Sequence, residues 1–104
     1  MLDKIVISDL LSKACVITEM QANSKIDVIE QLTQSLCDEG IITNKQGFIT
    51  DVLARESLGS TGFENQIAIP HGKSRWVSET RIAVAKLKDN IDWETMDSSD
   101  VKLV

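Results

Sequence analysis

The chain contains one histidine, His71, which follows a short apolar run and lies between Pro70 and Gly72. Pro70 fixes its own φ and favours an extended Ile69, so we expect a strand to lead directly to the imidazole ring. Gly72 leaves the other flank without a side chain, which we expect to let another molecule approach the ring. An unperturbed imidazole has a pKa of ~6.5, so a neutral, nucleophilic ring is abundant at physiological pH. Taken alone, such a histidine is more often an ordinary surface or turn residue.

The loop before the histidine carries groups that can hold phosphate oxygens. Ser60 and Thr61 offer two hydroxyls, and Gly62 leaves the backbone free to turn its amides toward an anion. Arg55 lies near the end of a predicted helix, and its planar guanidinium can bind two phosphate oxygens at once. Each feature alone is also typical of an ordinary turn or a solvated helix end. Together they favour phosphoryl transfer at His71.

Two amphipathic helices are expected to position these groups. Ser24 followed by Asp27 resembles a capping box, and the helix it begins ends at Gly40. Its apolar face is formed by Val28, Ile29, Leu32 and Leu36. A second helix is predicted from a cap at Thr43 to about Glu56, with an apolar stripe formed by Phe48, Ile49, Val52 and Leu53.

Strands are predicted at residues 15–18, 67–69, 81–87 and from 101 onward, with one short helical turn within 5–11. The small and apolar residues that alternate along 81–87 predict an interior strand covered on both faces. Turns are expected at Asp89-Asn90 and at 97–100. Helices that alternate with strands indicate an α/β layered fold.

The composition excludes several classes of function. The chain has 104 residues and a net charge of −5, which disfavours binding to nucleic acids or to anionic membranes. We find no signal-peptide pattern and no apolar run long enough to cross a membrane. Cys15 and Cys37 match no zinc or redox spacing, so we expect buried free thiols in a reducing cytoplasm. Trp76 and Trp93 are expected to pack against other residues.

Three anchors in this order and spacing resemble a known family: Arg55-Glu56, Ser60-Thr61-Gly62, and the run Ile-Ala-Ile-Pro-His-Gly-Lys at 67–73. They resemble the enzyme IIA domain of the fructose–mannitol class (type 2) of the phosphoenolpyruvate-dependent sugar phosphotransferase system. The resemblance extends more loosely over the whole chain. It implies a mixed sheet with helices on both sides, and no metal or organic cofactor.

The resemblance also implies a role for each anchor. His71 corresponds to the phosphorylated nucleophile, Arg55 to an arginine that balances the phosphate charge, and Ser60, Thr61 and Gly62 to the loop packed against the site. The family takes phosphate from the phosphocarrier protein HPr and passes it to a IIB component for uptake of a fructose- or mannitol-like sugar. This implies a cytoplasmic phosphotransferase that is not itself inserted in the membrane.

Nitrogen-type IIA proteins and IIA domains of transcriptional activators share the motif, so the alternative is a regulatory domain switched by phosphorylation of His71. The family's domain continues past the point that corresponds to residue 104 and carries a second active-site histidine there. We therefore expect 1–104 to be a single domain that is incomplete at its C-terminal end.

A hydrolase that pairs His71 with Ser60 or Ser74 is a third hypothesis. It has little support, because the chain lacks a G-x-S-x-G elbow and no acid stands out as the third group of a triad.

Overall fold

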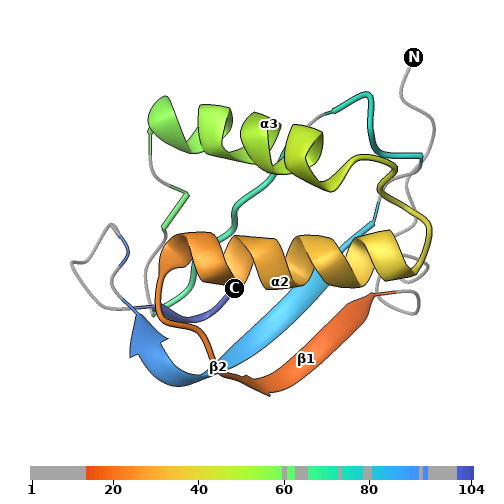
Figure 1. Cartoon of the computed structure of the whole chain (residues 1–104). Helices are drawn as coiled ribbons and strands as arrows, with labels where there is room; N and C mark the ends of the chain where they lie inside the picture. Colours follow the sequence, from red (N-terminus) through yellow and green to blue (C-terminus); the bar gives the residue numbers. More distant parts are fainter. Residues whose placement is uncertain are drawn as a thin grey trace, which may run out of the picture.

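The computed structural model describes residues 14–59, 61–62, 66–72, 74–78, 81–91, 93 and 101–104. In these residues the order of elements is β1 (Cys15–Met20), α2 (Lys25–Asp38), α3 (Lys45–Ser57), β2 (Ala83–Ile91) and β3 (Val101–Leu103). The helices α2 and α3 run antiparallel, and α2 lies between α3 and the strands (Figure 1). The predicted α/β fold class is confirmed.

The three strands form one mixed sheet in the order β1-β2-β3. β1 pairs with β2 in parallel and β3 pairs with β2 in antiparallel orientation. β2 is therefore the central strand, as the alternating small residues predicted. The mixed sheet that the family resemblance implied is also present.

The segment before His71 lies alongside β3. Ile67 forms a parallel bridge with Leu103, and the Ala68 amide donates to the Leu103 carbonyl at 3.0 Å. On its other side Ala68 forms an antiparallel bridge with Gly62. The extended conformation predicted for 67–69 is thus confirmed, although the pairing is limited to single bridges.

The ends of the helices follow from their capping residues. The Ser24 hydroxyl accepts a hydrogen bond from the Asp27 amide at 3.2 Å, as predicted, and Gly40 follows α2 with a φ of +74°. The N-cap of the second helix lies one residue after the predicted position. Asn44 rather than Thr43 is the cap, because the Asn44 side chain accepts from the Gly47 amide at 3.1 Å while the Thr43 hydroxyl donates to the Trp76 carbonyl.

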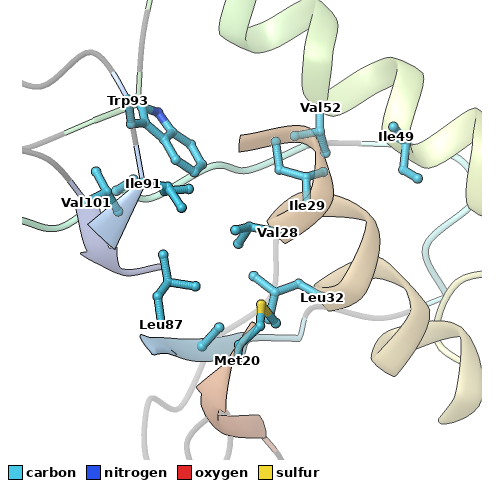
Figure 2. Close-up of a cluster of buried hydrophobic side chains, with 12 residues drawn as sticks. Met20, Val28, Ile29, Leu32, Ile49, Val52, Leu87, Ile91, Trp93 and Val101 are labelled. Carbon is cyan, nitrogen blue, oxygen red and sulfur yellow. The ribbon is translucent and has the colours of Figure 1, made fainter. Parts of the chain in front are cut away.

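The core lies between the sheet and the helices (Figure 2). Val28, Leu87 and Val101 are the largest apolar side chains that are fully buried. α2 and α3 both contribute to this core, against the face of β2 that carries Ala85 and Leu87. The core also includes Met20, Ile29, Leu32, Ile49, Val52, Ala68, Ile91 and Trp93.

Two predictions for the strand expected at 81–87, which is β2, need correction. β2 continues to Ile91, so the turn predicted at Asp89-Asn90 is wrong: Ile91 is buried and pairs with Val101, which keeps the chain extended. Both faces of this strand were predicted to be covered by other elements. The Lys86 side chain is exposed, so one face is covered only in part. Helices on the second side of the sheet stay a prediction. The short turns expected within 5–11 and at 97–100 lie outside the described residues.

The packing predicted for the two tryptophans is confirmed, whereas the two cysteines are less buried than predicted. Trp93 is 4% exposed, and Trp76 packs against Gly47, where a Cβ atom would lie 2.3 Å from the indole nitrogen. Cys15 and Cys37 are both free thiols and partly buried.

Candidate functional site

The His71 side chain is exposed, and the backbone orients its ring. The Nδ1 atom lies 2.9 Å from the carbonyl oxygen of Ile69, two residues earlier. A carbonyl oxygen only accepts hydrogen bonds, so this contact places the proton of the neutral ring on Nδ1. The lone pair of the ring is then on Nε2, which makes Nε2 the nucleophilic atom.

Gly72 is required for the contact between the histidine segment and α3. A Cβ atom at this position would lie 2.9 Å from the Val52 Cγ2 atom and 3.4 Å from a ring carbon of Phe48. The missing side chain therefore makes room for α3. The expected access of an incoming molecule to the ring stays a prediction.

Arg55 lies in the last turn of α3, about one helical turn beyond Val52. Its Nη1 atom donates to the Gly59 carbonyl at 2.8 Å. This bond holds the guanidinium at the start of the loop that leads to residues 61 and 62.

The predicted phosphate-binding loop is only partly described. Ser60 lies outside the described residues. Thr61 is buried, and both its amide and its hydroxyl donate to the carboxylate of Glu56. Gly62 pairs with Ala68, so this loop runs beside the segment that leads to His71.

Glu56 is a buried carboxylate, so the alternative that Arg55 and Glu56 form a solvated helix end does not hold for Glu56. Lys25 forms an ion pair with it at 2.6 Å and also lies over the Trp93 ring, 5.0 Å from its centroid. Burial by itself raises the pKa of the Glu56 carboxyl. The hydrogen bonds from Lys25 and Thr61, together with the charge of Lys25, outweigh burial and hold that pKa below its usual value.

A periodic signal in the sequence was available for Glu56. The buried positions of α3 are Ile49, Val52 and Glu56, which recur at helical spacing. A charged residue on the buried face of an amphipathic helix indicates a specific partner. Lys25 offered no such signal, since only the packing of α2 against α3 brings it to Glu56.

An open hollow of about 460 Å³ adjoins His71 between the helices and the strands. Its lining is mostly apolar and includes Leu32, Val52, Ile69 and Leu103. The histidine thus lies at the border between an apolar surface and solvent.

The hydrolase hypothesis finds no support in this geometry. The Nδ1 atom of His71 faces a backbone carbonyl, whereas a triad requires a carboxylate at that atom. The Ser74 hydroxyl accepts from the Trp76 amide at 3.3 Å. In the part of the chain that the structure describes, no group of His, Cys, Asp and Glu residues could hold a metal ion. The helices described here are all too short or too polar to cross a membrane.

Comparison with known proteins identifies the family. Residues 9–104 match the family model described as phosphoenolpyruvate-dependent sugar phosphotransferase system, EIIA 2. The fructose-like EIIA component of the phosphotransferase system of Escherichia coli (strain K12) is 35% identical over 91 residues, which are 88% of this chain and 62% of that protein. The chain thus spans less than two thirds of the length of this relative.

Two solved structures have the same arrangement of elements. The nitrogen regulatory protein IIA-Ntr of Neisseria meningitidis is 26% identical with a TM-score of 0.71, over 93% of this chain and 66% of that one. Enzyme IIAMTL of Escherichia coli, solved in complex with phosphorylated enzyme IIBMTL, matches with a TM-score of 0.73 over 86% of this chain and 62% of that one. At 20% sequence identity, this match shows a shared fold only. With a family model that covers nearly its whole length, this chain belongs to the type 2 EIIA family of the phosphoenolpyruvate-dependent sugar phosphotransferase system.

Proposed function

We propose that this chain is a phosphocarrier in which Nε2 of His71 accepts a phosphoryl group from HPr and passes it to a IIB component. The observation that carries the proposal is the contact between Nδ1 and the Ile69 carbonyl, which leaves the exposed ring with its lone pair on Nε2. The match to the EIIA family supports this assignment. The solved complex of enzyme IIAMTL with phosphorylated enzyme IIBMTL supports a IIB component as the acceptor.

The transfer is a displacement at phosphorus. The Nε2 lone pair attacks the phosphorus atom of the donor phosphohistidine, and the donor's N–P bond breaks with its electron pair left on the donor ring. The proton on Nδ1 stays in place and is stabilised by the Ile69 carbonyl as the ring gains positive charge. The P–N bond that forms remains reactive, so the group can move on to IIB.

The negative charge on the oxygens of the transferred phosphoryl group must be stabilised by nearby hydrogen-bond donors or positive charges. We assign this role to Arg55, to the hydroxyl and backbone amide of Ser60 and to the backbone of Gly62, with no metal or organic cofactor. Thr61 was predicted as a further phosphate ligand. Because its hydroxyl and amide donate to Glu56, we propose that it contributes mainly by holding the loop.

The sugar served is proposed to be fructose- or mannitol-like, and the reaction to take place in the cytoplasm. The fructose-like EIIA component of E. coli supports the fructose assignment. The likeness to IIA-Ntr supports the alternative, in which phosphorylation of His71 switches binding to a regulatory partner.

The test is phosphorylation of the purified chain with phosphoenolpyruvate, enzyme I and HPr. We expect one acid-labile, base-stable phosphoryl group per chain, absent in His71→Gln and retained in the surface variant Lys88→Gln. A fructose-type IIB should then remove the label. Label that persists in His71→Gln would overturn the assignment, whereas label that forms but never moves to any IIB favours the regulatory alternative.

A further inference from the structure

Glu56 is a buried acid that the proposed transfer step does not use. Its side chain is 4% exposed, and it lies in the last turn of α3, next to Arg55. Buried carboxylates are rare unless they are paired, so the contacts of this group indicate what it holds in place.

Three parts of the chain meet at the Glu56 carboxylate. Lys25, at the first position of α2, forms the ion pair at 2.6 Å. Thr61, in the loop after α3, donates both its amide, at 3.2 Å from Oε1, and its hydroxyl. The carboxylate thereby joins the start of α2, the end of α3 and the loop.

The loop in turn holds the segment that presents the histidine. The Ile69 amide donates to the Thr61 carbonyl at 3.0 Å, and Gly62 pairs with Ala68. The Ile69 carbonyl then accepts from Nδ1 of His71 at 2.9 Å. An unbroken series of hydrogen bonds thus runs from Glu56 through Thr61 and Ile69 to the imidazole.

We propose that Glu56 is a positioning residue for His71: through Thr61 it fixes the backbone of Ile69, and so the orientation and the tautomer of the ring. The role in transfer rests on the proposed phosphocarrier function, while the effect on the tautomer does not. The carboxylate is bonded to Thr61 and Lys25 and the ring to the Ile69 carbonyl, so Glu56 acts on the ring indirectly and takes no part in bond making.

The energetics favour a positioning role over a purely stabilising one. The ion pair gains little net stability, because the buried Glu56 carboxylate has lost its hydration, which offsets much of its attraction to the partly exposed Lys25. What such a pair supplies is a fixed geometry, and here the geometry is that of the loop beside His71. A displacement of about 1 Å at a reacting group can cost ~10²-fold in rate.

The experiment uses the single histidine as its own reporter. The variants are Glu56→Gln, which removes the charge, and the pair Thr61→Val and Thr61→Ser, which remove and retain the hydroxyl. Asn44→Ala is the matched control, since it removes the cap at the opposite end of α3 and costs about 1 kcal/mol of stability. Urea unfolding first identifies the variants that fold.

Two readouts are taken on each folded variant. Nitrogen-15 NMR of the imidazole gives the tautomer ratio, and rapid-quench labelling with phosphorylated HPr gives the transfer rate. We expect the Nδ1–H form to dominate in the unmodified chain, in Thr61→Ser and in Asn44→Ala. In Glu56→Gln and Thr61→Val we expect a mixture of tautomers and transfer slowed roughly 10- to 100-fold.

The outcomes separate this inference from the proposed function. If the unmodified chain takes no label, the phosphocarrier assignment fails, and the NMR arm alone decides whether Glu56 positions the ring. If the chain is labelled but Glu56→Gln and Thr61→Val match Asn44→Ala in both readouts, the positioning role is overturned. Should Glu56→Gln not fold, the contrast between Thr61→Val and Thr61→Ser decides.

Discussion

At the scale of single residues, the imidazole ring of His71 is oriented by the main chain. The partner of Nδ1 in His71 is the carbonyl of Ile69, which cannot be protonated or deprotonated near neutral pH. The tautomer of His71 therefore depends on the position of this backbone carbonyl. It does not depend on the protonation of the group that Nδ1 contacts. In the proposed transfer, the charged groups are Arg55 and, through Thr61, Glu56.

Arg55 offers a test of the charge that we assign to it. Arg55→Gln should slow phosphoryl transfer to His71 by about 10²-fold, because a donor to the transferred oxygens is lost. Arg55→Lys should recover only part of the rate, since an ammonium cannot bind two oxygens in one plane. The rates are measured by rapid quench with phosphorylated HPr.

Lys45→Gln is the control for Arg55, because it removes the same charge at the other end of α3. It should transfer at the rate of the unmodified chain. Equal rates in Arg55→Gln and Lys45→Gln would contradict a role for Arg55 in the site.

The Glu56 ion pair predicts a dependence of stability on pH. The pKa of this carboxyl in the folded chain is held below its ordinary value of 4.5, so the folded state favours the ionised form. The contribution of the Glu56 carboxylate to stability is complete above the pKa that this group has in the unfolded chain. It is lost as the pH falls through the pKa that the group has in the folded chain. The free energy of unfolding should therefore differ most between the unmodified chain and Glu56→Gln at neutral pH.

Urea titrations from neutral pH down to well below 4.5 measure this difference. It should shrink on acidification, because the protonated carboxyl and the amide are both uncharged. A difference that stays constant across the range would show that the charge of Glu56 does not stabilise the fold.

At the scale of elements, α3 connects the parts of the site. It carries Arg55 and Glu56 in its last turn, and its Val52 side chain touches the chain at Gly72. One helix thus positions the guanidinium, the loop after it and the residue that follows the histidine. A shift of α3 would move all three together.

The contact between Gly72 and Val52 can be tested with a double-mutant cycle. Gly72→Ala should destabilise the chain by about 1–3 kcal/mol, because the new methyl group would lie 2.9 Å from Val52 Cγ2. Val52→Ala leaves room for that methyl group, so Gly72→Ala should cost less in the Val52→Ala background. Urea unfolding of the four chains gives the coupling energy, and additive costs would contradict the contact.

The sequence predicted best where the determining contacts are local. Ser24 and Gly40 end α2 through bonds within a few residues, and both were visible in the sequence. The end of β2 depends instead on the pairing of Ile91 with Val101 in another strand, outside the range of local turn preferences. The turn residues Asp89 and Asn90 were therefore misleading, since the pairing with β3 outweighs their local preference.

The same distinction holds for the site. His71 and Arg55 are marked by their own residue types and spacing, so the sequence alone proposed them. The ion pair of Lys25 with Glu56 joins two helices, and its effect on the loop depends on the Thr61 hydrogen bonds. Such a series of tertiary contacts has no spacing pattern from which it could have been predicted.

At the scale of the whole molecule, the core is a single cluster that joins the sheet to both helices (Figure 2). Leu87 on the central strand is 1% exposed, so Leu87→Ala should cost about 2–5 kcal/mol in the free energy of unfolding. Lys88→Ala, next to it on the exposed face, should change stability by less than about 0.5 kcal/mol. Urea unfolding checks both, and equal effects would contradict the assigned direction of the two faces.

The pairing of the histidine segment with β3 has a consequence for biosynthesis. Ala68 bonds to Leu103, and Lys102 and Leu103 both donate to the Gln66 carbonyl, so residues 66–69 need residues 102 and 103 as neighbours. A ribosome adds about 5–20 residues per second, so β3 is synthesised on the order of seconds after the histidine segment. During this interval the two helices can already form from contacts close in sequence. The paired arrangement of residues 66–69 can therefore form only after β3 has been synthesised.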